Sequence, residues 1–506
     1  MNAENTHKIL GPPGCGKTTD LLKRVDLLLN EGYSPREICF ITFTRKAAGE
    51  AKSRAMAKFK MQEGDLPWFR TIHSLVFQRL GLSRSMMMGK GDYCNLCEVL
   101  GIYITFKGVS EDGTIAGFSK GDRLFFMENM ARARMMDLRK YWEDSPPDEG
   151  IYWYELDRLS KTLRAYKEKN DKRDFTDMLE IFVKGDHEGP PVKVLIVDEA
   201  QDLSKLQWEV VNRLAKNVEE VYVAGDDDQA IFRWAGADVD TFINLPGDSR
   251  VLPQSYRVPI RVQALAEEIR GRIQVRMKKD WLPTEELGEV IHVGDMRMDM
   301  SKGTWLLLAR NVYLLEEYCS YCLQNGYIFD AVNSPIRGGA VRAIKAWEEL
   351  RRGKSVTIAD VRCVYDLMSV KKGVRHGSKS MVEKINDQET VDMARLRRDL
   401  GLITTEIWHV ALDKITALER EYFIAALRRG EKLLREPRIK VSTIHGAKGG
   451  EADHVVLQLD MAERTYREYE VSPDDEMRVW YVACTRAKKT LTIIAPRTGQ
   501  FFEPLA

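Results

Sequence analysis

Short apolar runs alternate along the chain with segments in which apolar residues recur at helical spacing. Ile9 and Leu10 lead directly into a glycine-rich segment, and the apolar positions of 21–29 then repeat every three or four residues, as on one face of a helix. Further apolar runs, which predict buried strands, occupy 38–42, 192–198 and 218–226. This alternation of strand and helix predicts an α/β domain with a mostly parallel sheet.

The same alternation returns in the second half of the chain. Apolar runs at 304–310, 439–443, 454–460 and 490–495 predict the strands of a second α/β core. Between the strands of each core lies a long segment of helical character, one of them rich in Met, Arg and aromatic residues and the other charged. The predicted fold class is α/β, with two parallel-sheet cores that each carry a mainly helical insertion. The expected segments are 1–81 and 186–258 for the first core, 82–185 for its insertion, 259–334 and 437–506 for the second core, and 335–436 for its insertion.

The composition is that of an ordinary soluble globular protein. Hydrophobic residues make up 44% of the 506 residues and charged residues 30%, which excludes a disordered or collagen-like chain, and the length requires more than one core. The sequence contains no run of about 18 apolar residues, so it predicts no membrane span. The N-terminal residues lack the apolar stretch of a signal peptide. The eight cysteines are too few for a disulfide scaffold, so a cytoplasmic location is expected.

Two features of the composition leave alternatives open. CxxC pairs at 94–97 and 319–322 could together bind zinc, but their separation in the sequence favours buried thiols. The formal net charge is +1, so any binding of nucleic acid must come from local basic faces. Basic clusters at 45–60 and 371–379 are candidates, although each is by itself more typical of a solvated surface.

The glycine-rich segment after Leu10 carries the clearest chemistry. GPPGCGKT matches the pattern G-x-x-x-x-G-K-[ST] between a predicted strand and a predicted helix, a setting that favours a phosphate-binding loop over an ordinary glycine-rich turn. Backbone N–H groups and the helix N-terminus would supply positive partial charge to phosphates. Lys17 is expected to reach the β- and γ-phosphates of ATP, and Thr18 to ligate Mg²⁺. The expected nucleotide contacts are Gly11, Pro12, Pro13, Gly14, Cys15, Gly16, Lys17, Thr18 and Thr19.

Acidic residues at the end of a buried strand are the expected partners of such a loop. Asp198 is expected to hold Mg²⁺, directly or through water, and Glu199 to polarise the attacking water as general base. A surface acidic cluster is the alternative, but the apolar run before these two residues is typical of a buried strand. Together with the phosphate loop, the two acids predict an ATPase.

Further segments follow in an order that is typical of one protein family. They are GPPGCGKT, ITFTRKAAGE, RTIHSL, DFTDML, LIVDEAQD, VAGDDDQAIFRWAGAD, LPQSYR, VSTIHGAKGGE and YVACTRAKKTL, from Gly11 to Leu491. In these segments the chain resembles the UvrD/Rep/PcrA type of superfamily 1 helicase. The resemblance implies two RecA-like cores, ATP and Mg²⁺ as cofactors, and unwinding of DNA in the 3′→5′ direction. It also implies single-stranded DNA and single-strand/double-strand junctions as partners.

The resemblance assigns roles to residues that spacing alone does not single out. It makes Gln229 the link between hydrolysis and DNA binding, and it brings Arg257 and Arg486 to the γ-phosphate from the second core. Tyr256 would stack on adenine, and Glu451 would contact the ribose or the phosphate side of the nucleotide. The DNA contacts that the resemblance implies are Thr42, Phe43, His73, Phe232, Trp234, Thr443 and His445.

The aromatic residues in this set have an alternative role in the core. Phe232 and Trp234 would either be platforms on which bases stack, an interaction worth about 1–3 kcal/mol per base, or pack in the interior. Phe43 lies at the end of a strand-like run and has the same two alternatives.

The sequence departs from the family pattern at several positions. No Gln precedes the phosphate loop, where relatives carry a motif that reads adenine; Gly450 replaces an apolar residue, and Ala235 stands where relatives carry Arg. Three hypotheses follow: a helicase, a translocase that strips proteins from single strands with little unwinding, and an inactive DNA-binding scaffold. The intact set of residues for hydrolysis disfavours the scaffold. The sequence leaves open the pathway, the oligomeric state and any accessory replication or repair proteins.

Overall fold

The computed structural model describes residues 1–42, 45–105, 119–145, 150–331, 338–431 and 436–505, which form two compact units. The first unit is Met1–Leu287 with Glu468–Thr485, and the second is Gly288–Arg467 with Arg486–Ala506. The first unit therefore runs past the boundary expected at 258 and takes in a segment near the C-terminus. The reason is that α20 (Pro473–Cys484) is almost entirely buried and packs against α11 (Ile260–Arg270).

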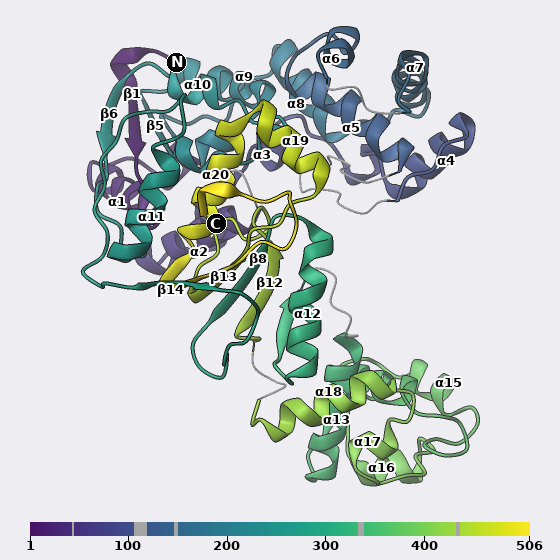
Figure 1. Cartoon of the computed structure of the whole chain (residues 1–506). Coiled ribbons are helices and arrows are strands. Elements are labelled where there is room, and N and C mark those ends of the chain that lie inside the picture. Colours follow the sequence, from purple (N-terminus) through teal and green to yellow (C-terminus); the bar gives the residue numbers. More distant parts are fainter. Residues whose placement is uncertain (43–44, 106–118, 146–149, 332–337, 432–435, 506) are drawn as a thin grey trace. The chain divides into compact units, whose positions relative to one another are not determined.

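The first unit contains one sheet of six parallel strands (Figure 1), in the order β3-β2-β4-β5-β1-β6. Its central strands are buried on both faces, as expected for a parallel sheet between two helical layers. Because all strands run the same way, their carboxyl ends meet at one edge, where ligands bind in such sheets. The strands are β1 (Thr6–Leu10), β2 (Ile38–Thr42), β3 (Phe69–Thr71), β4 (Val194–Val197), β5 (Glu220–Gly225) and β6 (Asp248–Val251).

Helices cover both faces of this sheet, because successive strand residues point to opposite sides. Ile9 and Ile196 belong to a cluster with the apolar residues of α1 and α2. Their neighbours Leu10 and Val197 belong to a second cluster with α3, α8 and α9. The helices are α1 (Lys17–Asn30), α2 (Arg45–Phe59), α3 (Ile72–Arg79), α8 (Phe175–Lys184), α9 (Lys205–Leu214) and the short α10 (Val239–Ile243).

The first insertion is helical in the part that the structure describes. It has an apolar core of its own, which includes Leu124 and Leu156. Asp174, in the segment DFTDML, caps α8 and binds Arg132 at 2.9 Å and Lys167 at 2.7 Å. These ion pairs connect the insertion to α8, which packs on the sheet. The helices are α4 (Lys90–Leu100), α5 (Lys120–Ala133), α6 (Leu138–Asp144) and α7 (Trp153–Lys169).

The second unit contains another sheet of six parallel strands, in the order β7-β14-β13-β8-β12-β9. The strands are β7 (Glu289–Val293), β8 (Trp305–Ala309), β9 (Phe329–Ala331), β12 (Ile439–Thr443), β13 (Ala452–Gln458) and β14 (Ala487–Ile494). The helices α12 (Leu315–Gln324) and α19 (Glu463–Val471) follow strands of this sheet in the chain, the latter running across the boundary between the two units. Two parallel-sheet cores, each with an insertion, confirm the predicted α/β fold class.

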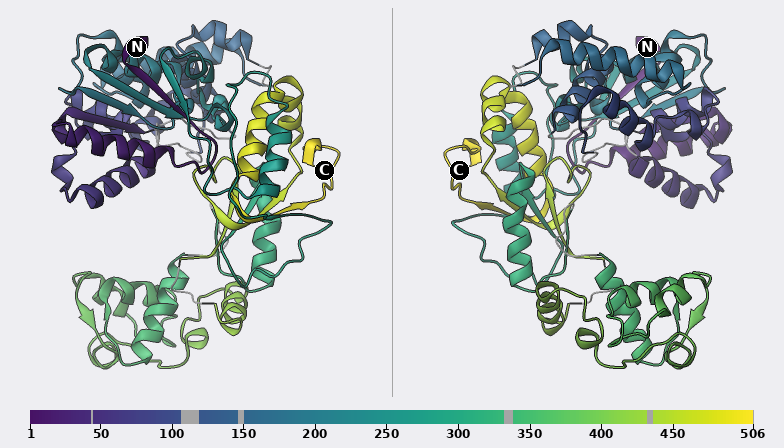
Figure 2. Two further views of the ribbon diagram at one scale, coloured as in Figure 1. Left: turned by 90° about the vertical axis from the view of Figure 1, so that its left-hand side faces the viewer. Right: turned by 90° about the vertical axis from the view of Figure 1, so that its right-hand side faces the viewer.

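The second insertion is mainly helical but not entirely so. Figure 2 shows its helices as a compact group of their own. The group also contains a two-stranded antiparallel ribbon, β10 (Val356–Thr357) and β11 (Thr390–Val391), which was not expected. Strands of two residues are too short to produce an apolar run in the sequence. The helices are α13 (Gly338–Arg351), α14 (Ile358–Asp366), α15 (Ser378–Glu383), α16 (Met393–Arg398), α17 (Trp408–Ala411) and α18 (Ala417–Arg428).

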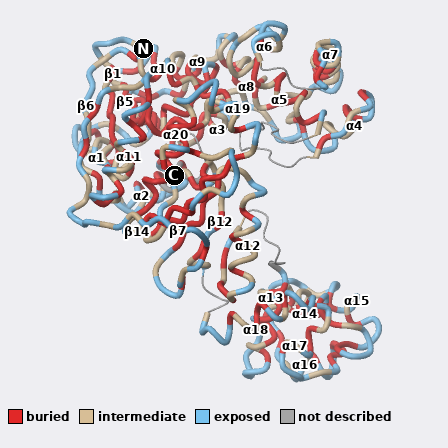
Figure 3. The backbone as a smooth tube through the Cα atoms, in the orientation of Figure 1, coloured by how far each residue is buried: buried red, intermediate tan, exposed pale blue. Residues whose placement is uncertain are grey.

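Burial separates the central strands from the edges of the sheets. Figure 3 shows β1 and β5 as buried stretches, whereas β6 is exposed along most of its length. The edge strand β7 is likewise largely exposed. Among the described residues, no helix has the length and the apolar character that crossing a membrane requires.

The two CxxC pairs lie on α4 of the first unit and α12 of the second, and all eight cysteines are free thiols. Burial raises the pKa of Cys97 to about 11 and that of Cys322 further. In the part of the chain that the structure describes, neither pair belongs to a group of three or more residues with metal-ligand geometry. Cys97 and Cys322 are therefore buried thiols, as predicted, whereas Cys94 and Cys319 are only partly buried.

Candidate active site

The phosphate loop joins β1 to α1 at the carboxyl edge of the first sheet. Gly14 and Gly16 have φ angles of 74° and 80°, in the left-handed region that glycine adopts without strain. A Cβ at Gly14 would also lie 2.5 Å from Cβ of Arg257, so the close approach of a second segment requires glycine as well. A glycine-rich turn that leads straight into a helix N-terminus is the arrangement that binds phosphates.

Lys17 is buried within this loop. Its Nζ donates to the carbonyl oxygens of Gly11, at 2.9 Å, and Pro12, at 3.4 Å. Burial by itself would lower the pKa of Lys17, but Cys15 and the three carboxylates at the ends of β4 and β5 raise it. Lys17 is therefore a permanent cation inside the loop that would surround the phosphates.

Asp198 follows β4 directly and lies beside the start of α1. Thr18 Oγ1 donates to Asp198 Oδ2 at 2.6 Å, and the backbone N–H of Glu199 donates to Oδ1 at 3.0 Å. Burial, and after it the charge of Glu199, raises the pKa of Asp198 to about 6. A hydroxyl and a carboxylate are oxygen ligands of the kind that Mg²⁺ prefers. The structure thus brings together the two residues predicted to hold the metal.

Glu199 is held in a strained conformation beside Asp198. Its φ is 55°, which is uncommon for a residue other than glycine and marks a position that the surroundings impose. Gln201 Nε2 donates to Glu199 Oε2 at 2.6 Å, while Gln201 Oε1 accepts from the backbone N–H of Asp226 at 3.0 Å. The sequence does not single out Gln201, because only the sheet order reveals that it joins the end of β4 to the end of β5.

Gln229 lies in a buried turn just after β5. Its Nε2 donates to Asp226 Oδ2 at 2.6 Å, so the side chain is held by the first acid of the run 226–228. Lys279, which the sequence does not single out either, has its ammonium among the three acids of that run. Three buried carboxylates imply a buried cation, but nothing in the sequence says which of the many lysines and arginines supplies it.

The segment 255–257 packs against the phosphate loop. Ser255 Oγ donates to the carbonyl oxygen of Pro13 at 2.7 Å. The backbone N–H of Tyr256 donates to the carbonyl oxygen of Gly14 at 2.9 Å. The side chain of Tyr256 is 76% exposed, so one of its faces is open to a ligand. Arg257 belongs to the first unit and lies beside the loop, which corrects the expectation that it approaches from the second core.

The remaining nucleotide residues belong to the second unit. Arg486 is buried just before β14 and donates to the carbonyl oxygen of Gly450 at 3.3 Å. Glu451 forms an ion pair with Lys488. Arg486 and Glu451 are thus brought into one neighbourhood of this unit, at the start of β13 and β14.

The predicted DNA contacts occupy several elements. In the second unit, Thr443 ends β12, and its Oγ1 accepts from the backbone N–H of Gly446 at 3.2 Å, next to His445. In the first unit, Thr42 is the buried last residue of β2, and Phe43 lies outside the described residues.

His73 and Phe232 line one small cavity of about 20 Å³ in the first unit. The His73 ring meets Phe175 edge-on, with ring centroids 6.0 Å apart. Trp234 is 47% exposed, and its ring stacks on Phe126 with centroids 6.3 Å apart. A tryptophan with one face supported and nearly half its surface exposed differs from a buried core residue.

Two family models match the chain. The model of an AAA domain matches residues 1–235, which include the phosphate loop, Asp198, Glu199 and Gln229. The model of the UvrD-like helicase C-terminal domain matches residues 370–498, which include Arg486 and Glu451. Between them the two matches span more than half of the chain.

Curated relatives agree with these matches. DNA helicase II of Salmonella typhimurium is 26% identical over 316 residues, which cover 55% of this chain and 41% of that protein. The ATP-dependent DNA helicase PcrA of Bacillus subtilis is 26% identical over 300 residues, 55% of this chain and 39% of that protein. DNA helicase II of Escherichia coli is 26% identical over 309 residues, which cover 54% of this chain and 40% of that protein. The matched part of the chain thus spans about two fifths of the length of these relatives.

Proposed function

Since the chain belongs to the UvrD/Rep/PcrA type of superfamily 1 helicase, we propose that it is an ATP-driven motor that moves along single-stranded DNA and unwinds duplex. One observation carries this proposal. Lys17, the Thr18–Asp198 pair and Gln229 lie at the carboxyl edge of one sheet, and Trp234, with an exposed ring, follows Gln229 after five residues. A phosphate site and a base-stacking platform on one short stretch of chain provide the means to couple hydrolysis to DNA binding.

The residues around the phosphate loop fit Mg-ATP. Lys17 neutralises the β- and γ-phosphates, and Thr18 with Asp198 holds Mg²⁺, which supplies further positive charge to the phosphates. Glu199, oriented by Gln201, accepts a proton from the attacking water. The fit rests on the donor set itself: an ammonium, a hydroxyl and a carboxylate at one helix N-terminus.

Further residues complete the nucleotide site in this proposal. Tyr256 stacks on the base with its exposed ring, next to the loop to which its backbone is bonded. Arg257 and Arg486 neutralise the charge that develops on the γ-phosphate during transfer. Glu451 contacts the ribose or the phosphate side of the nucleotide. Gln229 senses the γ-phosphate and passes its state to the turn that carries Trp234.

Single-stranded DNA is the proposed track. Bases stack on Trp234, whose ring is supported from behind by Phe126, and on Phe232. Phe43, Thr42 and His73 add contacts from the first unit. Thr443 and His445 add contacts to the DNA backbone from the second unit. The direction, 3′→5′, follows the family, as do single-strand/double-strand junctions as substrates.

Strand displacement on tailed duplexes tests the proposal. Duplexes with a 3′ or a 5′ single-stranded tail are compared, and ATP hydrolysis is measured on the same preparation with and without single-stranded DNA. We expect unwinding from the 3′ tail and stimulation of hydrolysis by DNA. Lys17→Ala is expected to lose both while still binding single strands. Stimulated hydrolysis without unwinding would instead indicate the translocase, and DNA binding without hydrolysis the inactive scaffold.

Trp234→Ala tests the stacking platform. We expect single-strand affinity to fall by about 1–3 kcal/mol, equally on mixed-sequence and homopolymer strands because stacking does not read sequence. Basal hydrolysis without DNA is expected to stay near the wild-type rate. Unchanged single-strand affinity in a stably folded variant would rule out the stacking role. Loss of thermal stability together with basal hydrolysis would instead indicate a structural tryptophan.

A further inference from the structure

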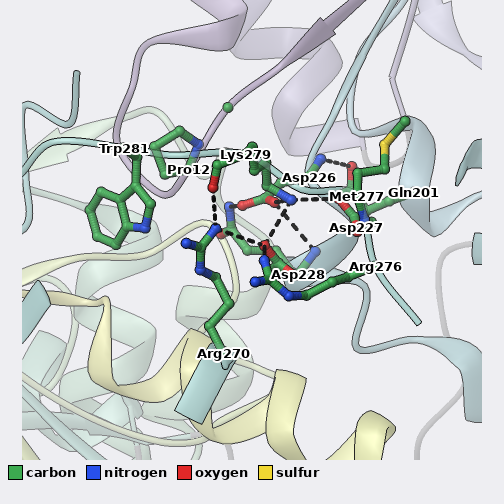
Figure 4. A network of polar contacts seen from close by, with 12 residues as sticks. Pro12, Gln201, Asp226, Asp227, Asp228, Arg270, Arg276, Met277, Lys279 and Trp281 are labelled. Atoms are coloured by element: carbon green, nitrogen blue, oxygen red, sulfur yellow. Dashed lines mark hydrogen bonds and ion pairs between the residues drawn. The ribbon is translucent and has the colours of Figure 1, made fainter. Parts of the chain in front are cut away.

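Three consecutive carboxylates after β5 are completely buried around one lysine (Figure 4). Nζ of Lys279 lies 2.9 Å from Asp226 Oδ1 and 2.8 Å from Asp228 Oδ2, and it also donates to Asp227 Oδ1. The side chain of Lys279 is itself only 1% exposed. A single ammonium therefore holds all three acids of the run 226–228.

The cluster depends on this cation. Burial would lower the pKa of Lys279, but the three carboxylates outweigh burial and raise it, so the side chain stays charged. Two further cations labelled in Figure 4, Arg270 and Arg276, have their nearest nitrogen atoms 3.7 and 3.9 Å from Asp228 Oδ2. Buried acids that lose their cation must move or take up protons. Lys279 is thus the cation nearest to all three acids, and it helps to hold the run 226–228 in place.

Asp226 connects Lys279 to the residues proposed for catalysis. Its Oδ1 faces Lys279, while its Oδ2 accepts from the Gln229 side chain at 2.6 Å. Its backbone N–H donates to Gln201, which in turn donates to Glu199. Asp226 therefore links the buried lysine to Gln229 through its carboxylate, and to Glu199 through its backbone N–H and Gln201.

The same turn anchors two segments that lead toward the second unit. The segment that carries Lys279 runs on to the boundary between the units, and in it the backbone N–H of Met277 donates to Asp227 Oδ2 at 2.7 Å. Helix α20 ends at another boundary, and its Arg478 donates through Nε to the carbonyl oxygen of Asp227 at 2.9 Å. The turn that holds Gln229 is thus also the attachment point of these two segments.

We propose that Lys279 is a positioning residue for ATP hydrolysis, which acts through Asp226 to hold Gln229 against the γ-phosphate. This inference rests on the proposed function, in which Gln229 senses that phosphate. In the part of the chain that the structure describes, the Lys279 side chain bonds to the three acids and not to the phosphate loop, so its effect falls on the rate of hydrolysis rather than on nucleotide binding. In the sequence, Lys279 follows the three acids of the run 226–228 by 51 to 53 residues.

The test compares Lys279→Met with two other variants. Lys278→Met is the matched control, because the neighbouring Lys278 is exposed. Lys279→Arg keeps the positive charge. In the full chain with single-stranded DNA, we expect Lys279→Met to lower kcat by about 10- to 100-fold, because a small displacement of a catalytic group costs that much. KM for ATP is expected to stay within about threefold, since binding by the phosphate loop is retained. Lys278→Met should match wild type, and Lys279→Arg should recover part of kcat.

A double-mutant cycle with Gln229→Ala tests the route. If Lys279 acts through Gln229, the combined variant hydrolyses ATP no more slowly than Gln229→Ala alone. Full multiplication of the two losses, or a wild-type kcat in folded Lys279→Met, would overturn the proposal. If Lys279→Met does not fold, the cycle is run with Lys279→Met/Asp228→Asn, which removes one buried anion together with the cation.

The outcomes separate this inference from the proposed function. A wild-type chain without DNA-stimulated hydrolysis contradicts the proposed function. An active wild type in which Gln229→Ala changes nothing contradicts the sensor role of Gln229. An active wild type that needs Gln229 but not Lys279 contradicts only the inference about Lys279.

Discussion

The ends of β4 and β5 lie next to each other in the first sheet, and both carry buried acids, but the two sites are built differently. After β4, Asp198 is bonded to a hydroxyl, and burial with the charge of Glu199 raises its pKa to about 6. After β5, the three acids surround Lys279. Burial would raise the pKa of Asp226, but the charge of Lys279 outweighs burial, so the pKa is lowered.

Neighbouring acids can thus have separate roles. After β4, burial and the charge of Glu199 both disfavour the ionised form of Asp198, and in the proposed function Mg²⁺ supplies the positive charge that stabilises it. An acid run that is ion-paired with a buried lysine has a fixed positive charge at its centre and can serve as a rigid support. The β4 site is therefore expected to respond to substitution through activity, and the β5 site through stability as well as activity.

The largest expected effect belongs to Glu199→Gln. Removal of the general base should slow ATP hydrolysis by about 10²- to 10⁴-fold, while Mg-ATP still binds because Thr18 and Asp198 remain. Single-turnover hydrolysis and nucleotide binding, measured on one preparation, check this. Thermal stability should change little. Failure to bind nucleotide would show that Glu199 is a ligand or a structural acid. The proposed difference between the β4 and β5 sites would then be wrong.

The next effect concerns the stability of the β5 site. Lys279→Met leaves three buried carboxylates without their nearest cation, and removal of one partner of a buried ion pair costs about 3–5 kcal/mol. Calorimetric unfolding should show the first unit melting at a clearly lower temperature. Lys278→Met, at the exposed neighbouring position, is the control and should melt like wild type. Equal melting of the two variants would mean that the acids are not held by Lys279.

The smallest effect is a pH dependence at the β4 site. The folded-state pKa of Asp198, about 6, lies above the unfolded value of about 3.9. The carboxyl group therefore contributes stability that is complete below about pH 4 and is lost as the pH rises through about 6. Asp198→Asn, whose amide cannot ionise, should gain stability relative to wild type over this range when metal and nucleotide are left out.

The measurement is the difference in melting temperature between Asp198→Asn and wild type at several pH values. Asp228, whose pKa burial raises to about 6 in spite of Lys279, is present in both proteins, so its contribution cancels in the difference. A difference that does not change with pH would contradict the raised pKa. Addition of Mg-ATP should reverse the trend for wild type, since the metal requires the ionised carboxylate.

Elements whose residues lie close together in the chain could be predicted from the sequence, because their signals are local. Central strands such as β4 and β8 are buried on both faces, so they must be apolar throughout and are visible as runs. The phosphate loop needs glycines at left-handed positions, a lysine and a hydroxyl in consecutive order, so its pattern fits within eight residues. Family resemblance added the roles of Gln229, Tyr256 and the arginines, which remain proposals.

Features that depend on residues far apart in the chain could not be predicted in this way, because folding brings those residues together. The edge strands β6 and β7 have exposed residues and no apolar run, so pairing alone reveals them. Arg257 joins the first unit because its segment bonds to the phosphate loop, more than two hundred residues earlier. Lys279 is one of many cations in the sequence. Its role arises because folding buries three carboxylates, and only the fold determines which cation is buried with them.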